Sequence, residues 1–449
     1  MKTEDIFKRL RLLLEERDFI SFRREIQEEN VMDIADFIAD LSDDYAIVAM
    51  RLLPKDMSVE VFSEFDSEMK EIFVAKITDK EIDHLLNEMF VDDLVDMIEE
   101  LPANVVARVL ERANPVDRNT INVFLQYPED SAGSIMTSEY VSLKRETRVI
   151  DAINNLRQNG HDSVTLYSLY VIDEKRVLEG VLSLKDLLLA KDDEIVSDLM
   201  ESVVISAHTH ADEEEVSYLF GKYNFMTLPI LDSENRLVGI VTVDDIMDVI
   251  LDRDTEDFSL MSGTLPSEKP YLKTSAWRLA RNRMGWLTLL MLSGIITGSI
   301  LARYEDAFLV LPVLVTFIPM LTDTGGNSGS QSSTLVIRGM VLNEIRLKDA
   351  WKVLFKEFQV SMIAGTFLAV ITFIRLMFTY SDKPLMVFVV SISILLTVMV
   401  AKIVGALLPF FAKIIKADPA IMAAPLITTI VDATSLLIYF TLATMVLGI

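Results

Sequence analysis

The sequence predicts a multidomain protein with an all-α helical N-terminal domain, an α/β repeat pair and an α-helical membrane domain with five transmembrane helices. Helical periodicity with proline-marked joints covers the first part, a strand–turn–strand pattern that occurs twice covers the second, and long apolar runs fill the rest. Charge follows the same division, because 59 acidic and 31 basic residues precede Met284, whereas 9 acidic and 11 basic residues occur from that position onward. The net charge of −26 therefore belongs to the predicted soluble part.

Residues 1–128 form the first predicted domain, an acidic superhelical stack of short helices. Proline follows an apolar residue at Leu53-Pro54 and Leu101-Pro102, where one helix should end and the next begin. No apolar leader-like stretch occurs at the start, so we expect this domain to stay in the cytoplasm. Proteins bind nucleic acid through clustered Lys and Arg residues. The acidic composition of this region therefore argues against nucleic acid as a partner and in favour of cations.

Two copies of one module follow, at residues 129–192 and 193–252. The segment Val171-Ile172-Asp173 is matched by Ile230-Leu231-Asp232 at an offset of 59 residues. Each copy has the pattern helix, strand, turn, strand, helix, with short apolar strands bounded by polar residues. This pattern resembles a tandem pair of CBS domains, small α/β modules that pack as a pseudo-dimer.

The resemblance to CBS domains implies a nucleotide ligand. In that family a Ser/Thr-x-x-Asp sequence after the second strand commonly contacts the ribose of an adenine nucleotide, and two such pairs occur here. They are Ser183 with Asp186 and Thr242 with Asp245. ATP or another adenine nucleotide is therefore one expected ligand, although capping of a following helix by the hydroxyl explains each pair equally well.

An acidic stripe at helical spacing leads from the second repeat into residues 253–283, which we predict to be a connecting acidic and amphipathic helix. The stripe consists of Asp245, Asp248, Asp252, Glu256 and Asp257. Like charges at this spacing repel each other by a few tenths of a kcal/mol per pair, and bound cations would relieve the repulsion. The other carboxylates that we expect to share divalent ions with it are Asp92, Asp93, Asp96 and Asp418. The alternative is an ordinary solvated acidic face.

The predicted membrane domain, residues 284–449, contains five apolar runs that are long enough to cross a bilayer. The runs are Met284–Ala302, Phe308–Val336, Phe358–Thr379, Leu385–Phe411 and Ile421–Leu447. With the N-terminal part in the cytoplasm, eleven basic residues fall in the cytoplasmic flanks and three in the opposite flanks. The positive-inside rule therefore predicts a multi-pass protein of the cell (plasma) membrane, with the soluble domains inside and the C-terminus outside.

One carboxylate lies near the middle of the last run, where a charge is costly unless it faces protein or a watery path. This residue is Asp432, and Pro425, Thr428 and Thr429 place a freed carbonyl and hydroxyls on the same helix. Oxygen ligands suit hard cations, and Mg²⁺ usually keeps several of its waters when one or two carboxylates bind it. We therefore predict an ion pathway at Asp432, with a structural ion pair to Lys402 as the alternative.

A polar, glycine-rich stretch interrupts the second run between Pro319 and Gln331. We predict a helix break at Gly325-Gly326 that exposes backbone carbonyls to the pathway. The residues assigned to the pathway in this stretch are Asp323, Gly325, Gly326, Asn327 and Gln331. Two simpler roles stay open: the carboxylate can cap the helix that resumes after the glycines, and the small residues can pack helices together.

The segments together resemble the MgtE family of magnesium channels over nearly the whole chain. The most specific motifs are P-M-L-T-D-T-G-G-N-S-G-S-Q in the second run and P-L-I-T-T-I-V-D in the last. The resemblance implies a homodimer in the lipid bilayer of the inner membrane, with a Mg²⁺-selective pore on its two-fold axis and Asp432 of each subunit at a Mg²⁺ site. It also implies a gate of cytosolic carboxylates that closes when Mg²⁺ is plentiful. Asn224 stands where a carboxylate would have helped, which weakens one ion site.

Two other functions stay open at this stage. One is a divalent-cation transporter coupled to H⁺ or Na⁺, in which the intramembrane carboxylates form a relay. The other is a membrane-anchored sensor of adenine nucleotide or ions. An enzyme is not expected, because no nucleophile, base and orienting group converge in the sequence. The absence of cysteine excludes thiolate metal sites.

Overall fold

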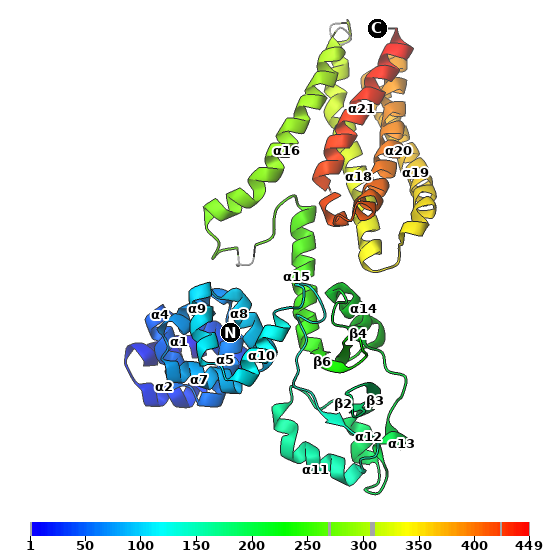
Figure 1. The fold of residues 1–449 in the computed structure, drawn as a ribbon. Coiled ribbons are helices and arrows are strands. Elements are labelled where there is room, and N and C mark those ends of the chain that lie inside the picture. The colour runs from blue at the N-terminus through cyan, green and yellow to red at the C-terminus, as the bar shows by residue number, and fades with distance from the viewer. Residues whose placement is uncertain (1, 268–270, 306–309, 423, 449) are drawn as a thin grey trace. The chain divides into compact units, whose positions relative to one another are not determined.

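The computed structural model describes residues 2–267, 271–305, 310–422 and 424–448. The chain divides into two compact units, Met1–Val249 and Ile250–Ile449 (Figure 1). The first unit contains short helices followed by an α/β pair, and the second contains the long apolar helices.

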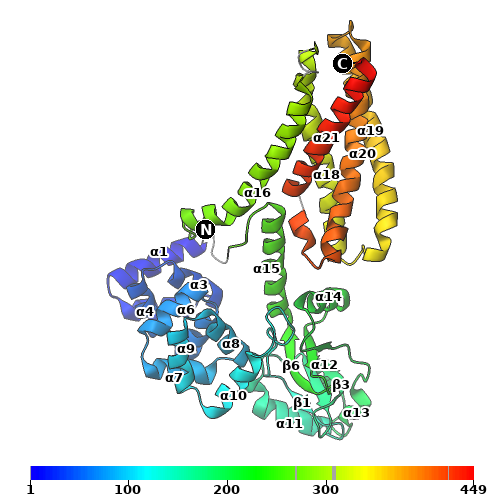
Figure 2. The same ribbon diagram turned by 45° about the horizontal axis from the view of Figure 1, so that its top comes forward.

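Ten short helices form the N-terminal domain in the part of the chain that the structure describes (Figure 2). They are α1 (Lys2–Glu15), α2 (Phe19–Ile26), α3 (Val31–Ala39), α4 (Asp43–Leu52), α5 (Lys55–Ser63), α6 (Ser67–Lys76), α7 (Asp79–Glu88), α8 (Val91–Glu100), α9 (Ala103–Arg112) and α10 (Pro115–Phe124). The two predicted joints are confirmed, since Pro54 and Pro102 occupy the N-cap positions of α5 and α9. Every helix contributes apolar side chains to one core.

The predicted repeat is confirmed as two three-stranded sheets with the same topology. The strands are β1 (Ser142–Leu143), β2 (Ser168–Ile172), β3 (Leu178–Ser183), β4 (Ala207–His208), β5 (Thr227–Leu231) and β6 (Leu237–Thr242). In each sheet the first strand runs parallel to the second and the third runs antiparallel to it. The register shifts after Val171 in one sheet and after Ile230 in the other, which preserves the 59-residue offset down to a bulge.

The helices of the α/β pair are α11 (Val149–Asn159), η1 (Gly160–Asp162), α12 (Leu184–Leu189), α13 (Val196–Leu199) and α14 (Glu213–Tyr223). The two copies are joined by exchanged segments. Thr137, which precedes the first sheet, forms a bridge with Ile240 of β6, and Glu201, which precedes the second, forms a bridge with Val181 of β3. The last strand of each repeat therefore pairs with a segment from the other repeat.

A single helix, α15 (Val243–Met261), follows the second repeat directly. The chain then turns at Gly263, which has a φ of +70° that favours glycine, and α16 (Ala276–Arg303) begins after the turn. Residues 253–283 are thus not one connecting helix as predicted. The acidic part belongs to α15, and the amphipathic part from Ala276 forms the first turns of α16.

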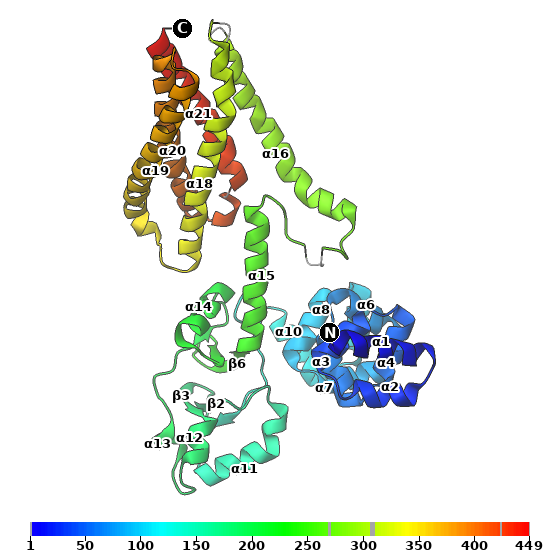
Figure 3. The same cartoon turned by 180° about the vertical axis from the view of Figure 1, so that it is seen from behind.

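The second unit is a bundle of long helices (Figure 3). Its elements are α16, η2 (Pro312–Phe317), α18 (Ile318–Val341), η3 (Leu347–Asp349), α19 (Ala350–Thr379), α20 (Pro384–Ile414), η4 (Pro419–Met422) and α21 (Ala424–Leu447). The helix α20 packs against α18, α19 and α21, whereas α16 packs against α21 and buries none of its residues. The predicted start of the second span, Phe308, lies outside the described residues.

Within the described ranges, four helical segments are long and apolar enough to cross a membrane. They are Ala276–Arg303, Leu347–Thr379, Pro384–Ile414 and Pro419–Leu447. The helix α18 has 24 residues, about 36 Å at about 1.5 Å per residue, but it is not one of these four segments. The count of five spans therefore stays a prediction.

Candidate functional site

The face of α18 that packs into the second unit is made of glycine and serine from Gly325 to Ser333. A Cβ atom on Gly325 would lie 2.7 Å from Cγ1 of Val431, and one on Gly329 would lie 2.6 Å from Cγ2 of Ile427. Both distances are shorter than van der Waals contact, so glycine is what lets α18 and α21 approach so closely. The predicted break at Gly325-Gly326 is wrong: the helix continues through both residues, because helices packed over them hold the backbone helical.

The opposite face of α18 carries exposed polar side chains at intervals of three and four residues. This α18 polar stripe consists of Asp323, Asn327, Gln331, Thr334 and Arg338. Because α18 begins at Ile318, Asp323 lies inside the helix and does not cap a resumed one. Polar groups at membrane depth require protein or water beside them.

Asp432 lies on α21 and is partly buried. Its carboxyl group is close enough to that of Asp323 on α18 for the two to repel each other. The hydroxyls of Thr428 and Thr429 donate hydrogen bonds to the carbonyl of Pro425, at 2.9 and 3.2 Å. Thr429 Oγ1 in turn accepts the hydroxyl of Ser293 at 3.5 Å, and both threonines lie on the helix that carries Asp432.

Lys402 does not pair with Asp432 among the described residues; its partners are Glu357 on α19 and Ser332 on α18. The Lys402 Nζ atom lies 4.0 Å from Glu357 Oε2 and donates to Ser332 Oγ at 3.3 Å, while the Ser332 hydroxyl donates to the same carboxylate at 2.5 Å. The lysine is 6% exposed, so its charge needs this compensation. Sequence reasoning missed Glu357 because it placed that residue just before the third apolar run.

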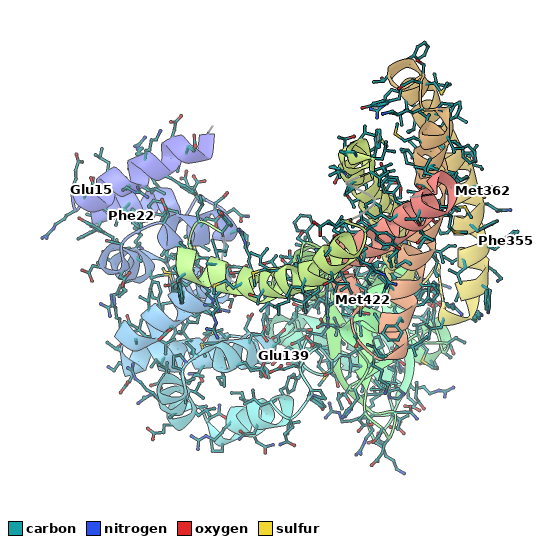
Figure 4. The ribbon with its side chains drawn as sticks, turned by 90° about the horizontal axis from the view of Figure 1, so that it is seen from above. Glu15, Phe22, Glu139, Phe355, Met362 and Met422 are labelled. Carbon is teal, nitrogen blue, oxygen red and sulfur yellow. The ribbon has the colours of Figure 1, made fainter. Side chains whose placement is uncertain are left out.

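The first unit contains a second group of carboxylates, which we call the cytosolic cluster. It includes Asp92 and Asp93 at the start of α8, Glu64 at the C-cap of α5, Glu139 (labelled in Figure 4) on the loop before β1, and Asp244, Asp245 and Asp248 of α15. The Ser63 hydroxyl donates to Asp93 Oδ2 at 3.1 Å. Asp92 Oδ1 is buried and has no hydrogen-bond partner in the described structure.

Burial and mutual repulsion make ionisation of this cluster unfavourable. Burial, together with the charges of Asp93, Asp245 and Glu139, raises the pKa of Asp92 to about 8. Burial and the neighbouring Asp244 raise the pKa of Asp245 to about 6, against a hydrogen bond from Thr242. Burial also raises the pKa of Glu64. Near neutral pH Asp92 therefore holds a proton that a cation could displace.

The predicted cytosolic ligands are only partly brought together. Asp92, Asp93, Asp245 and Asp248 belong to the cluster, whereas Asp96 is exposed on α8. The remaining predicted ligands, Asp252, Glu256, Asp257 and Asp418, lie in the second unit. In the described ranges, no three Asp, Glu or His side chains are close enough to coordinate one ion. The sequence did not reveal Glu64, Glu139 or Asp244 as members of the cluster. Glu64 and Glu139 come from separate elements, and no regular spacing in the sequence connects them with the other carboxylates.

The two hydroxyl–carboxylate pairs of the α/β repeats have the geometry of caps. Ser183 Oγ accepts the backbone N–H of Asp186 at 3.0 Å, and its own hydroxyl donates to that carboxylate at 2.5 Å. Thr242 donates to Asp245 in the same way, at 2.5 Å. Asn224 ends α14 in the left-handed conformation, with a φ of 55°, which asparagine tolerates better than most residues.

Comparisons with known proteins agree on one family. A family model described as a divalent cation transporter, MgtE, matches residues 318–442, the MgtE intracellular N domain matches 29–130, and the CBS domain matches 132–193 and 196–252. The magnesium transporter MgtE of Thermus thermophilus is 34% identical over 97% of both chains, and that of Bacillus subtilis is 33% identical over 99% of this chain and 98% of the relative.

The chain belongs to the MgtE family. Two solved structures resemble its first unit. The soluble part of a magnesium transporter has a TM-score of 0.53 at 29% identity and covers 56% of this chain and 99% of its own. The cytosolic domain of the Mg²⁺ channel MgtE in complex with ATP has a TM-score of 0.51 at 35% identity, with coverages of 54% and 98%.

The MgtE assignment confirms the resemblance that the sequence motifs indicated. The matched ranges include the α18 polar stripe, Asp432, Lys402 and the α8 carboxylates. The predicted fold class is confirmed as well, as a helical N domain, a CBS pair and apolar helices. The roles assigned to individual residues stay predictions.

Proposed function

We propose that this MgtE protein is a Mg²⁺ channel or transporter that takes up divalent cations across the cell membrane. One observation carries the proposal: Asp432, on an apolar helix, is partly buried within electrostatic range of Asp323, and neither carboxyl pairs with a Lys or Arg side chain among the described residues. Two carboxylates that repel each other favour a cation or a proton near them. Mg²⁺, held through its own waters by one or two carboxylates, fits such a site and can still leave it.

A homodimer with the pore between its subunits supports the same function. The α18 polar stripe is exposed on the single chain, and α16 buries none of its residues. Two copies that face each other through the stripes would surround Asp432 with polar groups and shield them from lipid. We propose five spans with the soluble domains in the cytoplasm and the C-terminus outside, which the distribution of basic residues supports.

The cytosolic cluster is proposed as the gate. Cytosolic Mg²⁺ would replace the proton on Asp92 and relieve the repulsion between Asp92, Asp245 and their neighbours. By linkage, Mg²⁺ then favours the state in which more carboxylates converge. We propose that the other predicted ligands join the cluster in that closed state. The solved relative with ATP supports an adenine nucleotide at the CBS pair, near Ser183 or Thr242.

The test combines growth with flux. A bacterium deficient in magnesium uptake is complemented with the wild type, with Asp432→Ala and with the matched control Asp382→Ala, whose carboxylate lies in an exposed turn. In parallel, Mg²⁺ entry into proteoliposomes is followed with a fluorescent indicator. We expect rescue and flux for the wild type and the control, and a loss of flux of about ten-fold or more for Asp432→Ala. Undiminished flux in Asp432→Ala would contradict the proposal.

Coupling to protons is the second candidate, because Asp323 and Asp432 lie within electrostatic range of each other, and one of two interacting carboxyls can hold a proton. The two candidates differ in how flux responds to a pH gradient at constant Mg²⁺. A channel gives Mg²⁺ flux that an opposed pH gradient leaves unchanged, whereas a coupled transporter drives Mg²⁺ against its own gradient.

A further inference from the structure

The N domain contains a cavity of about 320 Å³ that has no part in the proposed ion pathway. Four helices form it: α4, α5, α6 and α7. Its inner wall is apolar and includes the side chains of Ile47, Phe62, Phe73 and Leu85. A volume of this size lies at the lower end of the range for small-molecule sites, which are mostly apolar with a few placed polar groups.

Cations surround the mouth of this cavity, although the chain as a whole carries a net charge of −26. Arg51, Lys55 and Lys80 contribute positive charge to the lining, and Glu81 is the acidic residue in it. Arg51 binds Glu81 with two hydrogen bonds, at 2.9 and 3.3 Å. Within the described residues, Lys55 and Lys80 have no carboxylate partner, so the lining has an excess of positive charge.

Glu81 offsets the charge of Arg51, to which it is bound, so the charges of Lys55 and Lys80 remain as the excess. Burial opposes its ionisation, but hydrogen bonds from Arg51 and Thr78 lower the pKa of Glu81 to about 2. The Thr78 backbone N–H and hydroxyl both donate to the same carboxylate at 2.7 Å. The next carboxylate along the chain, Asp79, is bound by Arg108 at 2.8 Å on the other side of α7.

One polar atom of the lining is buried and has no hydrogen-bond partner among the described residues, namely His84 Nε2. A buried polar group without a partner costs free energy, and a ligand that supplies the partner recovers it. The apolar wall, the excess of positive charge and this nitrogen are three separate features of one cavity. The wall suits the apolar body of a single ligand, and the positive charge and the nitrogen suit its charged end.

We propose that this cavity binds a small amphipathic anion, with an aromatic or aliphatic body against the apolar wall and a carboxylate at Lys55, Lys80 and His84. The site does not depend on the proposed transport function. It is nevertheless connected to the cytosolic cluster, because α5 carries Phe62 in the cavity wall and, at the next position, Ser63, which holds Asp93.

Ligand-observed NMR on the full chain tests the proposal. Saturation transfer to 2-naphthoate is measured with the protein in phosphatidylcholine nanodiscs, with empty nanodiscs subtracted, and is repeated with the neutral 2-naphthalenemethanol. We expect saturable binding of the carboxylate below about 1 mM and binding of the alcohol weaker by about ten-fold. Equal affinity for the two probes, or no saturable signal above empty nanodiscs, overturns the proposal.

Variants locate the binding. Lys55→Ala/Lys80→Ala removes the two unpaired cations and should weaken 2-naphthoate by about ten-fold or more, while leaving the alcohol unchanged. The control Lys8→Ala/Lys175→Ala removes two exposed lysines elsewhere in the same unit and should bind both probes as the wild type does. Undiminished binding of 2-naphthoate to the Lys55/Lys80 variant places the anion elsewhere and refutes the assignment.

Discussion

Asp92 should make the stability of the first unit depend on pH when Mg²⁺ is absent. Burial and neighbouring carboxylates raise its pKa from 3.8 to about 8 in the folded protein. An acid with a raised pKa contributes stability that is fully present below the unfolded pKa and is lost as pH rises through the folded one. The free energy of unfolding of this unit therefore falls by about 1.4 kcal/mol per pH unit above pH 6, and by less near pH 8, where the folded carboxyl itself ionises. Between pH 6 and pH 8 the total loss of unfolding free energy is about 2 kcal/mol.

Hydrogen exchange measures this loss of stability in the segments that surround Asp92. The full chain in EDTA is exchanged at pH 6 and pH 8, corrected for intrinsic rates, and the protection of peptides from α8 and from β6 to α15 is compared. A loss of about 2 kcal/mol lowers their protection factors about 30-fold. Asp92→Asn should remove the dependence on pH, and saturating Mg²⁺ should reduce it in the wild type. Asp56→Asn, on exposed α5 surface, is the control that should keep it.

The reasoning is refuted if Asp92→Asn shows the same fall in protection as the wild type, because the titrating group is then elsewhere. It is equally refuted if protection rises between pH 6 and pH 8 in EDTA. Asp245 does not produce the same fall in stability between pH 6 and pH 8. Its pKa is about 6, so most of the stability that depends on its protonation is already lost below pH 6.

Two further predictions concern the second unit, which holds all three tryptophans and can be followed by their fluorescence. Glu357→Gln leaves Lys402 buried without its counter-charge and should lower the free energy of unfolding by about 3–5 kcal/mol. The double variant Glu357→Gln/Lys402→Met should unfold at a higher temperature than Glu357→Gln alone. A double variant that is no more stable contradicts the pairing. Gly263→Ala adds a methyl at a φ of +70° and against the Trp286 ring, so it should destabilise the turn by about 1–2 kcal/mol and shift tryptophan emission. Gly294→Ala, which meets open space, should do neither.

The repeated part of the fold was predictable from sequence because its signal is internal. A 59-residue offset recurs in strands, turns and even the bulge after Val171 and Ile230. The exchange of the segments at Thr137 and Glu201 was not predictable, since each pairs with a strand of the other copy and no periodicity records such a contact. Contacts between the two repeats can be seen only in the folded structure.

The glycine motif shows a different limit. Gly325 and Gly326 weaken helical propensity, so local reasoning predicted a break, yet the packing of α20 and α21 overrides that propensity. The partner of Lys402 was missed for a related reason. Glu357 lies just outside an apolar run in sequence, but α19 continues through it and brings it into the bundle.

The membrane carboxylate was predictable because a charge in an apolar run stands out. The structure places Asp323 within electrostatic range of Asp432, and the pathway itself stays a prediction. The cytosolic cluster was predictable in part. Helical spacing revealed Asp92, Asp93 and the α15 carboxylates, but Glu64 and Glu139 come from a helix end and a loop. Only the folded unit shows that they share one electrostatic environment.

Cysteine accessibility tests most directly whether the Asp432 position opens to water. The chain has no cysteine, so Asp432→Cys introduces a single thiol, and the adjacent, fully buried Val431→Cys provides the matched control. Proteoliposomes of each variant are treated with a charged, membrane-impermeant thiosulfonate reagent and the modified fraction is measured by mass. Rapid modification of Asp432→Cys beside an unreactive Val431→Cys is the predicted result; an Asp432→Cys thiol as unreactive as its neighbour would contradict the existence of an ion pathway there.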